Sequence, residues 1–412
     1  MRIPLGENCG LDGSLFLRLS WPGHLVANMS NLEYTKIDIP EEQVADLYRR
    51  LSETRWPISP AGEPWEFGTS LVYLREVISI WVTQFNWREK EAHLNRYTHV
   101  LAPHEGRWVH AAVAKAEKSA KPPVILAHGW PGSFVEFLEV AERLAHPEKF
   151  GGMSEDGVDV VMVSLPGCGL SSAPSKPMGP REIARDLISL CQSLGIEKFF
   201  IHGSDWGAAV ASWLALDAPD AVFGVHLTSA IIQPTLNDHS LLSNDEQDFL
   251  NYRSSRGPSD SGYRVIQGTK PLTLSYALTD SPAGLAGWLL EKFQHWSESR
   301  HVATGPAIDL DTLLTIVSLY WFAGPGPASW IYRSLMDGTG LVFEDGVKVA
   351  VPTGICSFRH DISPIAPPEW QERCYHVVSR SEIDHGGHFP GLDAPAALSD
   401  DIRSFMTLVL QH

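Results

Sequence analysis

The stretch that decides the fold is residues 198–207, Lys-Phe-Phe-Ile-His-Gly-Ser-Asp-Trp-Gly. Its apolar start predicts a buried strand of a parallel sheet, and the alanine-rich run at 208–216 predicts a helix directly after the turn. Gly203 and Gly207 flank Asp205. A Cβ at either glycine would clash with the turn or with the neighbouring strand. The pattern is typical of a strained strand-to-helix turn that lifts one side chain, here Asp205, above the sheet.

This turn is the nucleophile elbow of the α/β-hydrolase fold, with a carboxylate in the raised position. Ser204 lies one position too early for that role. A carboxylate attacks a saturated, electrophilic carbon and leaves an alkyl ester on the enzyme. Hydrolysis of the ester then requires a histidine held by an acid, and N–H donors for the oxyanion. A helix-capping aspartate in an ordinary βα turn is the alternative that this short motif leaves open.

Composition describes a large globular chain of 412 residues, 44% of them apolar, with 14 tryptophans. Its 32 basic and 49 acidic residues give a net charge of −17, which disfavours nucleic acid or an anionic membrane as a partner. No long apolar stretch occurs in the first thirty residues, so we expect no membrane anchor. The cysteines are odd in number and in no metal spacing, which favours reduced thiols and a cytoplasmic location. They are Cys9, Cys168, Cys191, Cys356 and Cys374.

Changes in pattern along the chain predict five segments. These are an extension at 1–32, an N-terminal module at 33–120, the first part of the hydrolase core at 121–230, a helical cap at 231–336 and the second part of the core at 337–412. Within the N-terminal module we expect helices that begin near 40 and at 71–86, and a strand at 108–113. In this fold, an insertion at the place of the cap lies over the catalytic end of the sheet.

The oxyanion donors are predicted from the first strand of the core. Residues 123–127 read as a strand that ends in His128-Gly-Trp-Pro-Gly-Ser133. This fold takes one N–H donor from the loop after that strand and one from the residue after the nucleophile. We therefore assign the backbone N–H groups of Trp130 and Trp206 to the oxyanion hole. The Trp130-Pro131 bond is a candidate for a cis peptide near the site.

The acid and the base are predicted near the carboxyl ends of the last two strands. Asp361 follows the strand at 354–358, and His388 follows the strand at 375–379, so the order nucleophile, acid, histidine matches this fold. Asp384 is a rival acid, but it is too close in sequence to His388 to support it easily. His385 and His388 also form an HxxH pair, but no third ligand is nearby, so we expect neither a metal nor a cofactor.

The cap segment is rich in aromatic residues, which predicts an apolar substrate chamber. Most of these side chains are expected to serve packing, and a few to touch the ligand. The pocket residues that we predict are Trp288, Trp321, Phe322 and Phe389.

From about residue 33 to 408, the chain resembles the microsomal-type epoxide hydrolases in their soluble fungal and bacterial form. The motifs that carry the resemblance are Glu53-Thr-Arg-Trp-Pro57, Phe85-Asn-Trp-Arg88, His128-Gly-Trp-Pro-Gly-Ser133, Gly203-Ser-Asp-Trp-Gly207, Ser261-Gly-Tyr263, Thr279-Asp-Ser-Pro282 and Gly386-Gly-His-Phe389. The resemblance implies a module that wraps the core and the cap. It also implies two cap tyrosines that hydrogen-bond the epoxide oxygen. Tyr263 matches the first of them and Tyr332 is the best match for the second, while Tyr320 is expected in the core.

The chain departs from the family pattern at three positions. Trp330 and Ser334, on either side of Tyr332, stand where relatives often carry Arg and Glu. Cys168 stands in a loop that often has an aromatic residue, so the shape of the pocket is expected to differ.

The predicted function is hydrolysis of an apolar epoxide to a vicinal diol without a cofactor, in a soluble protein that can form a homodimer through the cap. A haloalkane dehalogenase-like hydrolase is the nearest competing function, because it also uses an Asp followed by Trp. The sequence also leaves open a non-catalytic ligand-binding member of the same fold, and diversion of the epoxide to cyclisation.

Overall fold

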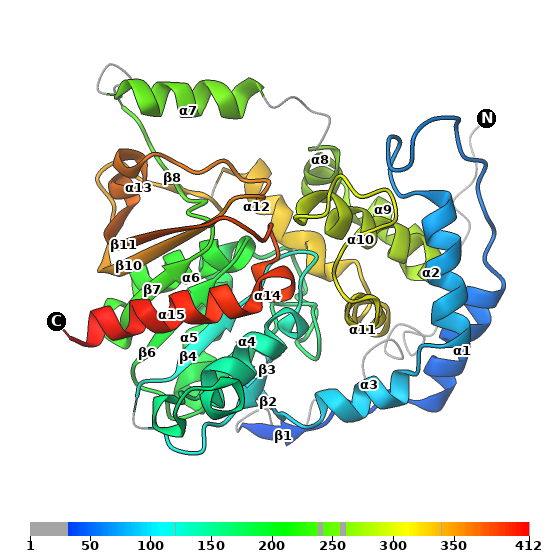
Figure 1. Ribbon diagram of the computed structural model, residues 1–412, viewed down its shortest axis with the longest axis horizontal. Coiled ribbons are helices and arrows are strands. Elements are labelled where there is room, and N and C mark those ends of the chain that lie inside the picture. Colours follow the sequence, from blue (N-terminus) through cyan, green and yellow to red (C-terminus); the bar gives the residue numbers. More distant parts are fainter. Residues whose placement is uncertain (1–31, 120, 238–241, 256–260, 339, 412) are drawn as a thin grey trace, which may run out of the picture.

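A nine-stranded sheet forms the centre of the computed structural model, which describes residues 32–119, 121–237, 242–255, 261–338 and 340–411 (Figure 1). The strand order is β1-β2-β3-β5-β4-β6-β7-β10-β11. The strands are β1 (Glu33–Thr35), β2 (Thr98–His104), β3 (Arg107–Ala114), β4 (Val124–Ala127), β5 (Val160–Val163), β6 (Phe199–Gly203), β7 (Val222–Leu227), β10 (Val349–Phe358) and β11 (Tyr375–Ile383). From β5 to β11 neighbouring strands are parallel, and β1 to β3 join the β5 edge antiparallel. The predicted α/β-hydrolase fold with a mostly parallel sheet is confirmed.

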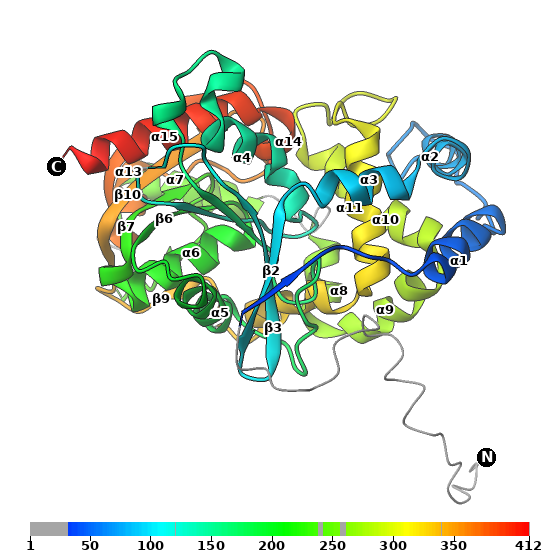
Figure 2. The ribbon, with the colours of Figure 1, turned by 90° about the horizontal axis from the view of Figure 1, so that it is seen from below.

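Helices cover both faces of the sheet, as Figure 2 shows. On one face α4 (Leu138–Ala145) packs against α15 (Pro395–Leu410), with the short α14 (Pro390–Asp393) beside them. On the other face α5 (Pro180–Ser193) packs against α6 (Trp206–Asp217). Because both faces are covered, the central strands β4, β5 and β6 are buried along their whole length and read as continuous apolar runs.

The boundaries of α5 illustrate how local sequence sets these elements. Pro180 stands at the first turn, where its missing N–H costs nothing, and the Glu182 carboxylate accepts the Gly179 N–H at 3.1 Å. Gly195, just past the end, has a φ of +70°, the left-handed conformation that stops helices. The apolar face of α5 is buried through Leu187 and Leu190, each worth about 1.5–3 kcal/mol of hydrophobic stabilisation.

Two expected elements differ from the observed ones. The helix expected at 71–86 is α2 (Leu71–Thr83), which ends three residues earlier, and a separate helix, α3 (Trp87–Leu94), follows it. The break occurs because the Asn86 side chain accepts the Arg88 N–H at 3.0 Å and caps a new helix start. The strand expected at 354–358 is the end of a longer strand, β10, which begins at Val349 and carries register shifts against β11.

The N-terminal module is part of the sheet. Strands β1, β2 and β3 all precede residue 120, and β3 pairs with β5 from Ala111 to Ala114. A boundary at 120 therefore divides one continuous sheet. The extension at 1–32 lies almost wholly outside the described residues.

The helical part of the N-terminal module is fastened to the cap. Trp65 donates its indole N–H to the Ala303 carbonyl at 3.0 Å, and the Thr69 hydroxyl donates to the Gly287 carbonyl at 2.5 Å. Two ion pairs add to these bonds: Arg50 of α1 (Glu41–Ser52) with Asp280 at 3.1 Å, and Lys90 of α3 with Asp311 at 2.5 Å. Helices α1 to α3 thus clasp the cap from outside (Figure 1).

The cap consists of helices that follow residue 261. They are α8 (Gly262–Thr269), α9 (Pro271–Asp280), α10 (Pro282–Trp296), α11 (Leu310–Ala323), a 3-10 helix (Pro327–Tyr332) and α12 (Arg333–Met336).

The first part of the expected cap segment lies elsewhere. Helix α7 (Asn244–Ser255) is separated from the other cap helices in Figure 1 and packs beside α13 (Pro368–Cys374). Arg373 of α13 donates to the Glu246 carboxylate at 2.5 Å, and the Phe249 ring lies 5.7 Å from that of Trp370. Before α7, β8 (Gln233–Pro234) pairs with β9 (Val342–Phe343) instead of forming a helix. The expectation that the whole of 231–336 is a helical lid is therefore wrong for its first part.

Among the described residues, no helix is long and apolar enough to cross a bilayer. The four described cysteines, Cys168, Cys191, Cys356 and Cys374, are buried free thiols, and Cys9 lies outside the described residues.

Candidate active site

The elbow has the geometry that its glycines predict. Asp205 joins β6 to α6 with φ 47° and ψ −125°, a strained conformation for a residue with a side chain. A Cβ on Gly203 would lie 2.3 Å from the carbonyl oxygen of Gly207, and one on Gly207 would lie 1.9 Å from that of Ala127. Both approaches are shorter than any real contact, so the turn requires glycine at both positions.

A backbone N–H group reaches the Asp205 carboxylate from the first of the two predicted places. The Trp130 N–H donates to Asp205 Oδ1 at 2.9 Å, and the Trp130-Pro131 bond is cis. A Cβ on Gly129 would lie 2.1 Å from that same oxygen, so the loop lies flat against the carboxylate. Trp206 is the first residue of α6, where helical N–H groups have no carbonyl partner within the helix.

His388 lies between two carboxylates. Its Nδ1 is 2.8 Å from Asp361 Oδ1, and its Nε2 is 3.4 Å from Asp205 Oδ2. Asp361 also accepts a hydrogen bond from the Ser229 hydroxyl at 3.0 Å, which helps to fix the orientation of its carboxylate toward His388. The backbone N–H of His388 donates to the Trp296 carbonyl of the cap at 2.8 Å, so the loop that carries His388 is anchored to the cap.

The electrostatics of this triad keep the imidazole protonated. Burial alone would lower the pKa of His388, but Asp361 and Asp205 outweigh it and raise that pKa to about 10. Burial would likewise raise the pKa of Asp361, yet the neighbouring His388 keeps it below its ordinary value. Both shifts describe an imidazolium shared by two carboxylates.

The two predicted phenols come together over the carboxylate. Tyr263 and Tyr332 are 6% and 2% exposed, and their ring centroids are 5.6 Å apart. Trp130 stacks on Tyr263 at 5.7 Å and meets the edge of Tyr332 at the same distance. Burial raises the pKa of Tyr332 well above 10, and the negative charge of Asp205 adds to this rise. Both phenols are therefore neutral donors.

The pocket residues predicted from composition are only partly at the site. Phe389 is buried next to His388 and packs against Trp296 at 6.0 Å. Trp288 lies one layer back, where its indole N–H donates to the Gln267 side chain at 3.1 Å. The structure places the other two predicted residues against the N-terminal module. The Phe322 ring lies 4.9 Å from that of Trp87, and the Arg50 guanidinium lies 5.8 Å from the Trp321 ring.

Trp296 is a site residue that the sequence showed only as one of many cap aromatics. Its ring lies 5.1 Å from Tyr263, 5.3 Å from His388 and 6.2 Å from Trp130. It therefore joins the phenols to the imidazole as one wall. Tyr320 is buried, as expected, and its hydroxyl donates to the Gly132 carbonyl at 2.8 Å, which supports the loop that carries Trp130.

Glu136 is the charged residue that sequence reasoning missed. It is 2% exposed and faces the site, since a Cβ on Gly132 would lie 2.4 Å from its Oε2 and the Ser204 hydroxyl lies 3.5 Å from its Oε1. Burial raises its pKa to about 8 and Asp205 adds to the rise, although His388 opposes it. The available signal was an acid inside the apolar run Phe-Val-Glu-Phe-Leu at 134–138.

Replacing Glu136 by glutamine should change how stability depends on pH. The folded wild type holds a proton between pH 4.5 and about 8 that the unfolded chain releases, so its stability falls as the pH rises through that window. Glutamine cannot lose that proton, so the variant should lack this fall and should become the more stable protein above pH 8. The difference should reach on the order of a few kcal/mol at most. Unfolding by denaturant from pH 5 to 9 measures it, with Glu139→Gln on the exposed side of α4 as the control for loss of a carboxylate.

The residues that offered rival roles lie apart from the site. The Asp384 side chain is 91% exposed and pairs with Arg359, and His385 is exposed. The candidate metal-ligand group among the described residues is His226, Cys356 and Asp401, under α15. There the His226 imidazole is hydrogen-bonded to the Asp401 carboxylate at 2.7 Å.

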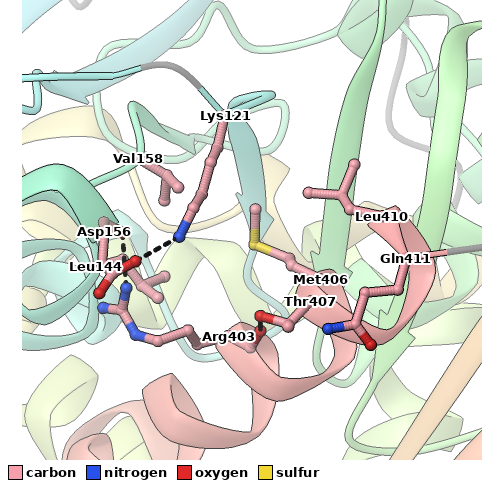
Figure 3. Close-up of a pocket in the computed structure, with 9 residues that line it drawn as sticks. All are labelled: Lys121, Leu144, Asp156, Val158, Arg403, Met406, Thr407, Leu410 and Gln411. Carbon is pink, nitrogen blue, oxygen red and sulfur yellow. Dashed lines mark hydrogen bonds and ion pairs between the residues drawn. The ribbon is translucent and has the colours of Figure 1, made fainter.

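Figure 3 shows a cavity of about 170 Å³ beside α15, also away from the triad. Its charged side chains are already paired. Lys121 forms an ion pair with Asp156 at 2.8 Å, and Arg403 donates to the carbonyls of Asp156 and Arg143 at 2.7 and 2.8 Å. The Asp205 side chain, by contrast, keeps 23% exposure, so this carboxylate is accessible to a small molecule.

Comparisons with known proteins agree with this geometry. Residues 32–137 match the family model "Epoxide hydrolase N terminus", and residues 122–262 match "alpha/beta hydrolase fold". The chain is 35% identical to a putative epoxide hydrolase of Stigmatella aurantiaca, over 89% of this chain and 83% of that protein. It is 32% identical to epoxide hydrolase 1 of Sus scrofa, over 92% and 89% of the two chains.

Solved structures show the same likeness. The epoxide hydrolase of Aspergillus niger superposes with a TM-score of 0.76 at 28% identity, over 92% of this chain and 96% of that chain. The juvenile hormone epoxide hydrolase of Bombyx mori gives a TM-score of 0.77 at 26% identity, over 92% and 94%. With relatives above 30% identity along most of its length and an elbow that presents a carboxylate, the chain belongs to the epoxide hydrolases of the α/β-hydrolase superfamily.

Proposed function

We propose that this epoxide hydrolase opens an apolar epoxide through an alkyl ester of Asp205. A carboxylate oxygen attacks one ring carbon as the C–O bond to the epoxide oxygen breaks. Tyr263 and Tyr332 hold that oxygen, and one phenol gives it a proton, since an alkoxide is a poor leaving group. Two buried phenols beside a carboxylate that keeps part of its surface accessible support these roles.

Hydrolysis of the ester then falls to His388 and Asp361. While Asp205 is ionised it helps to hold the proton on His388. Alkylation removes that negative charge, so the pKa of His388 falls and its proton leaves to solvent, to be regained once Asp205 is a carboxylate again; in between, the neutral imidazole can act as a base. Water gives one proton to Nε2 and adds to the ester carbonyl, and the Trp130 and Trp206 N–H groups stabilise the oxyanion. Collapse releases the diol oxygen, which takes the proton from His388, while the other water proton restores the phenol.

The observation that carries this proposal is the shared position of His388 between Asp205 and Asp361 under the paired phenols. Single turnover in ¹⁸O-water tests it, with enzyme in excess over a styrene-type epoxide. We expect an unlabelled diol and an ¹⁸O atom in the peptide that contains Asp205, because water attacks the enzyme's carbonyl. Label in the diol with none in the peptide would instead mean direct attack of water on the epoxide.

A dehalogenase activity is the competing use of the same nucleophile. Halide leaves without a proton, so such a site needs N–H donors rather than two phenols. A halide-release assay on haloalkanes, run beside a panel of aryl and aliphatic epoxides, separates the two activities. We expect diol formation without halide release.

We also propose a cytoplasmic location and a homodimer formed through the cap. Buried free thiols support the first. Exposed apolar side chains on α8 and α9 support the second; they are Val265, Ile266, Leu272 and Tyr276. Light scattering of the wild type and of Leu272→Asp measures the second, with a dimer expected only for the wild type.

A further inference from the structure

The side chain of Arg264 touches the hydroxyl of its neighbour Tyr263. Its Nε lies 2.9 Å from the phenolic oxygen, so an exposed residue of α8 reaches a buried group of the active site. A guanidinium group has only donors. The Tyr263 oxygen must therefore accept this bond, and its own hydrogen must point away from Arg264.

We propose that Arg264 is a positioning residue for epoxide opening, acting through Tyr263. It turns the Tyr263 O–H toward the epoxide oxygen and stabilises the phenolate that remains when the proton leaves. In this step the Asp205–carbon bond forms, the ring C–O bond breaks, and the Tyr263 proton moves to the freed oxygen. The inference rests on the proposed function, since it assumes Tyr263 to be the proton donor.

The charges around Tyr263 make Arg264 the dominant cation. Lys292 lies 4.9 Å above the Tyr263 ring, but it is paired directly with Glu291, which offsets its field. Asp205 acts in the opposite sense from below. Arg264, by contrast, contacts the oxygen itself, and a charge-assisted hydrogen bond is about twice as strong as a neutral one.

The titration of Tyr263 follows the same balance. Burial raises the pKa of Tyr263, and the charge and hydrogen bond of Arg264 work against that rise, together with a hydrogen bond from Tyr332. Loss of the guanidinium should therefore raise the pKa further and make the phenol a weaker acid.

Arg264→Met, placed in a His388→Ala background, tests the inference. This background stops at the alkyl-enzyme and removes the imidazole from the pH profile, so the rate of adduct formation reports ring opening alone. We expect Arg264→Met to slow adduct formation roughly tenfold to a hundredfold and to move the alkaline limb of its pH profile to higher pH. Arg264→Lys should recover part of the rate. Arg181→Met, which removes an exposed arginine of α5 paired with Asp217, should leave both unchanged.

A double-mutant cycle separates this role from a structural one. In a Tyr263→Phe background, Arg264→Met should have no further effect, because the partner oxygen is gone. Equal losses with and without the phenol would overturn the inference, as would an unchanged rate and alkaline limb. If the parent His388→Ala enzyme forms no adduct at all, the proposed function fails first. If the parent enzyme forms the adduct and Arg264→Met forms it at the same rate, only the role of Arg264 is contradicted and the proposed function stands.

Discussion

Asp205→Asn is expected to abolish the conversion of epoxides to diols, with a fall in kcat on the order of ten-thousandfold or more. An amide does not carry the charge that attacks the ring carbon, and no other carboxylate among the described residues shares its approach to both His388 and the phenols. Asparagine is the substitution of choice because it has the shape of aspartate, so the strained turn at φ 47° and ψ −125° need not change. Steady-state diol formation measures the loss.

A second measurement on the same variant reports the electrostatics. One of the carboxylates that raise the pKa of His388 to about 10 becomes neutral, so that pKa should fall, which an NMR titration of the imidazole follows. The wild type loses the stability due to this proton as the pH rises from 6.5 through about 10, and the variant should lose it at lower pH. Asp384→Asn, far more exposed, is the control. Substantial residual turnover in Asp205→Asn would contradict the assignment of the nucleophile.

His388→Ala is expected to stop the reaction halfway. Alkylation needs only the carboxylate and the phenols, so the variant should consume about one epoxide per active site and then stall as a stable ester. Intact-mass spectrometry should show the protein gaining the mass of the epoxide, and peptide mapping should place the adduct on Asp205. Steady turnover should fall by a factor comparable with the loss in Asp205→Asn, because the two side chains act as a unit.

His385→Ala provides the matched control, since it removes an exposed imidazole three residues away. It should turn over normally and accumulate no adduct. A His388→Ala enzyme that neither binds the epoxide covalently nor turns over would argue against a covalent mechanism. Normal turnover by the His388→Ala enzyme would show that another residue acts as the general base.

Much of the site is predictable from sequence because its residues lie in short motifs or directly after predicted strands. The elbow needs glycines at fixed spacing around Asp205, and β10 and β11 end just before Asp361 and His388. Parallel strands bring their carboxyl ends to one edge, so residues far apart in the chain meet there. Trp130 follows by the same reasoning, and its N–H bond to Asp205 matches.

The sequence does not predict which neighbour a side chain or a helix faces, because tertiary packing decides this. Trp321 and Phe322 follow the buried stripe of α11, but successive residues point about 100° apart, and both turn toward the N-terminal module. Helix α7 has an apolar side that fits α13 as well as it would fit a lid, and only contact with Trp370 decides between them. The position of the Glu136 carboxylate depends on the absence of a side chain at Gly132, which the periodicity of the sequence does not reveal.

The clasp of α1 to α3 around the cap has a consequence for how substrate enters and product leaves. The same module contributes β1 to β3 to the central sheet, and it is hydrogen-bonded to the cap through Trp65 and Thr69. A rigid-body movement of the cap away from the sheet would break those hydrogen bonds, together with the ion pairs of Arg50 with Asp280 and of Lys90 with Asp311. We therefore expect the substrate to reach the carboxylate through the accessible part of its surface, aided by rotamer changes of the surrounding aromatic side chains. The volume of those side chains should then limit the size of the epoxide.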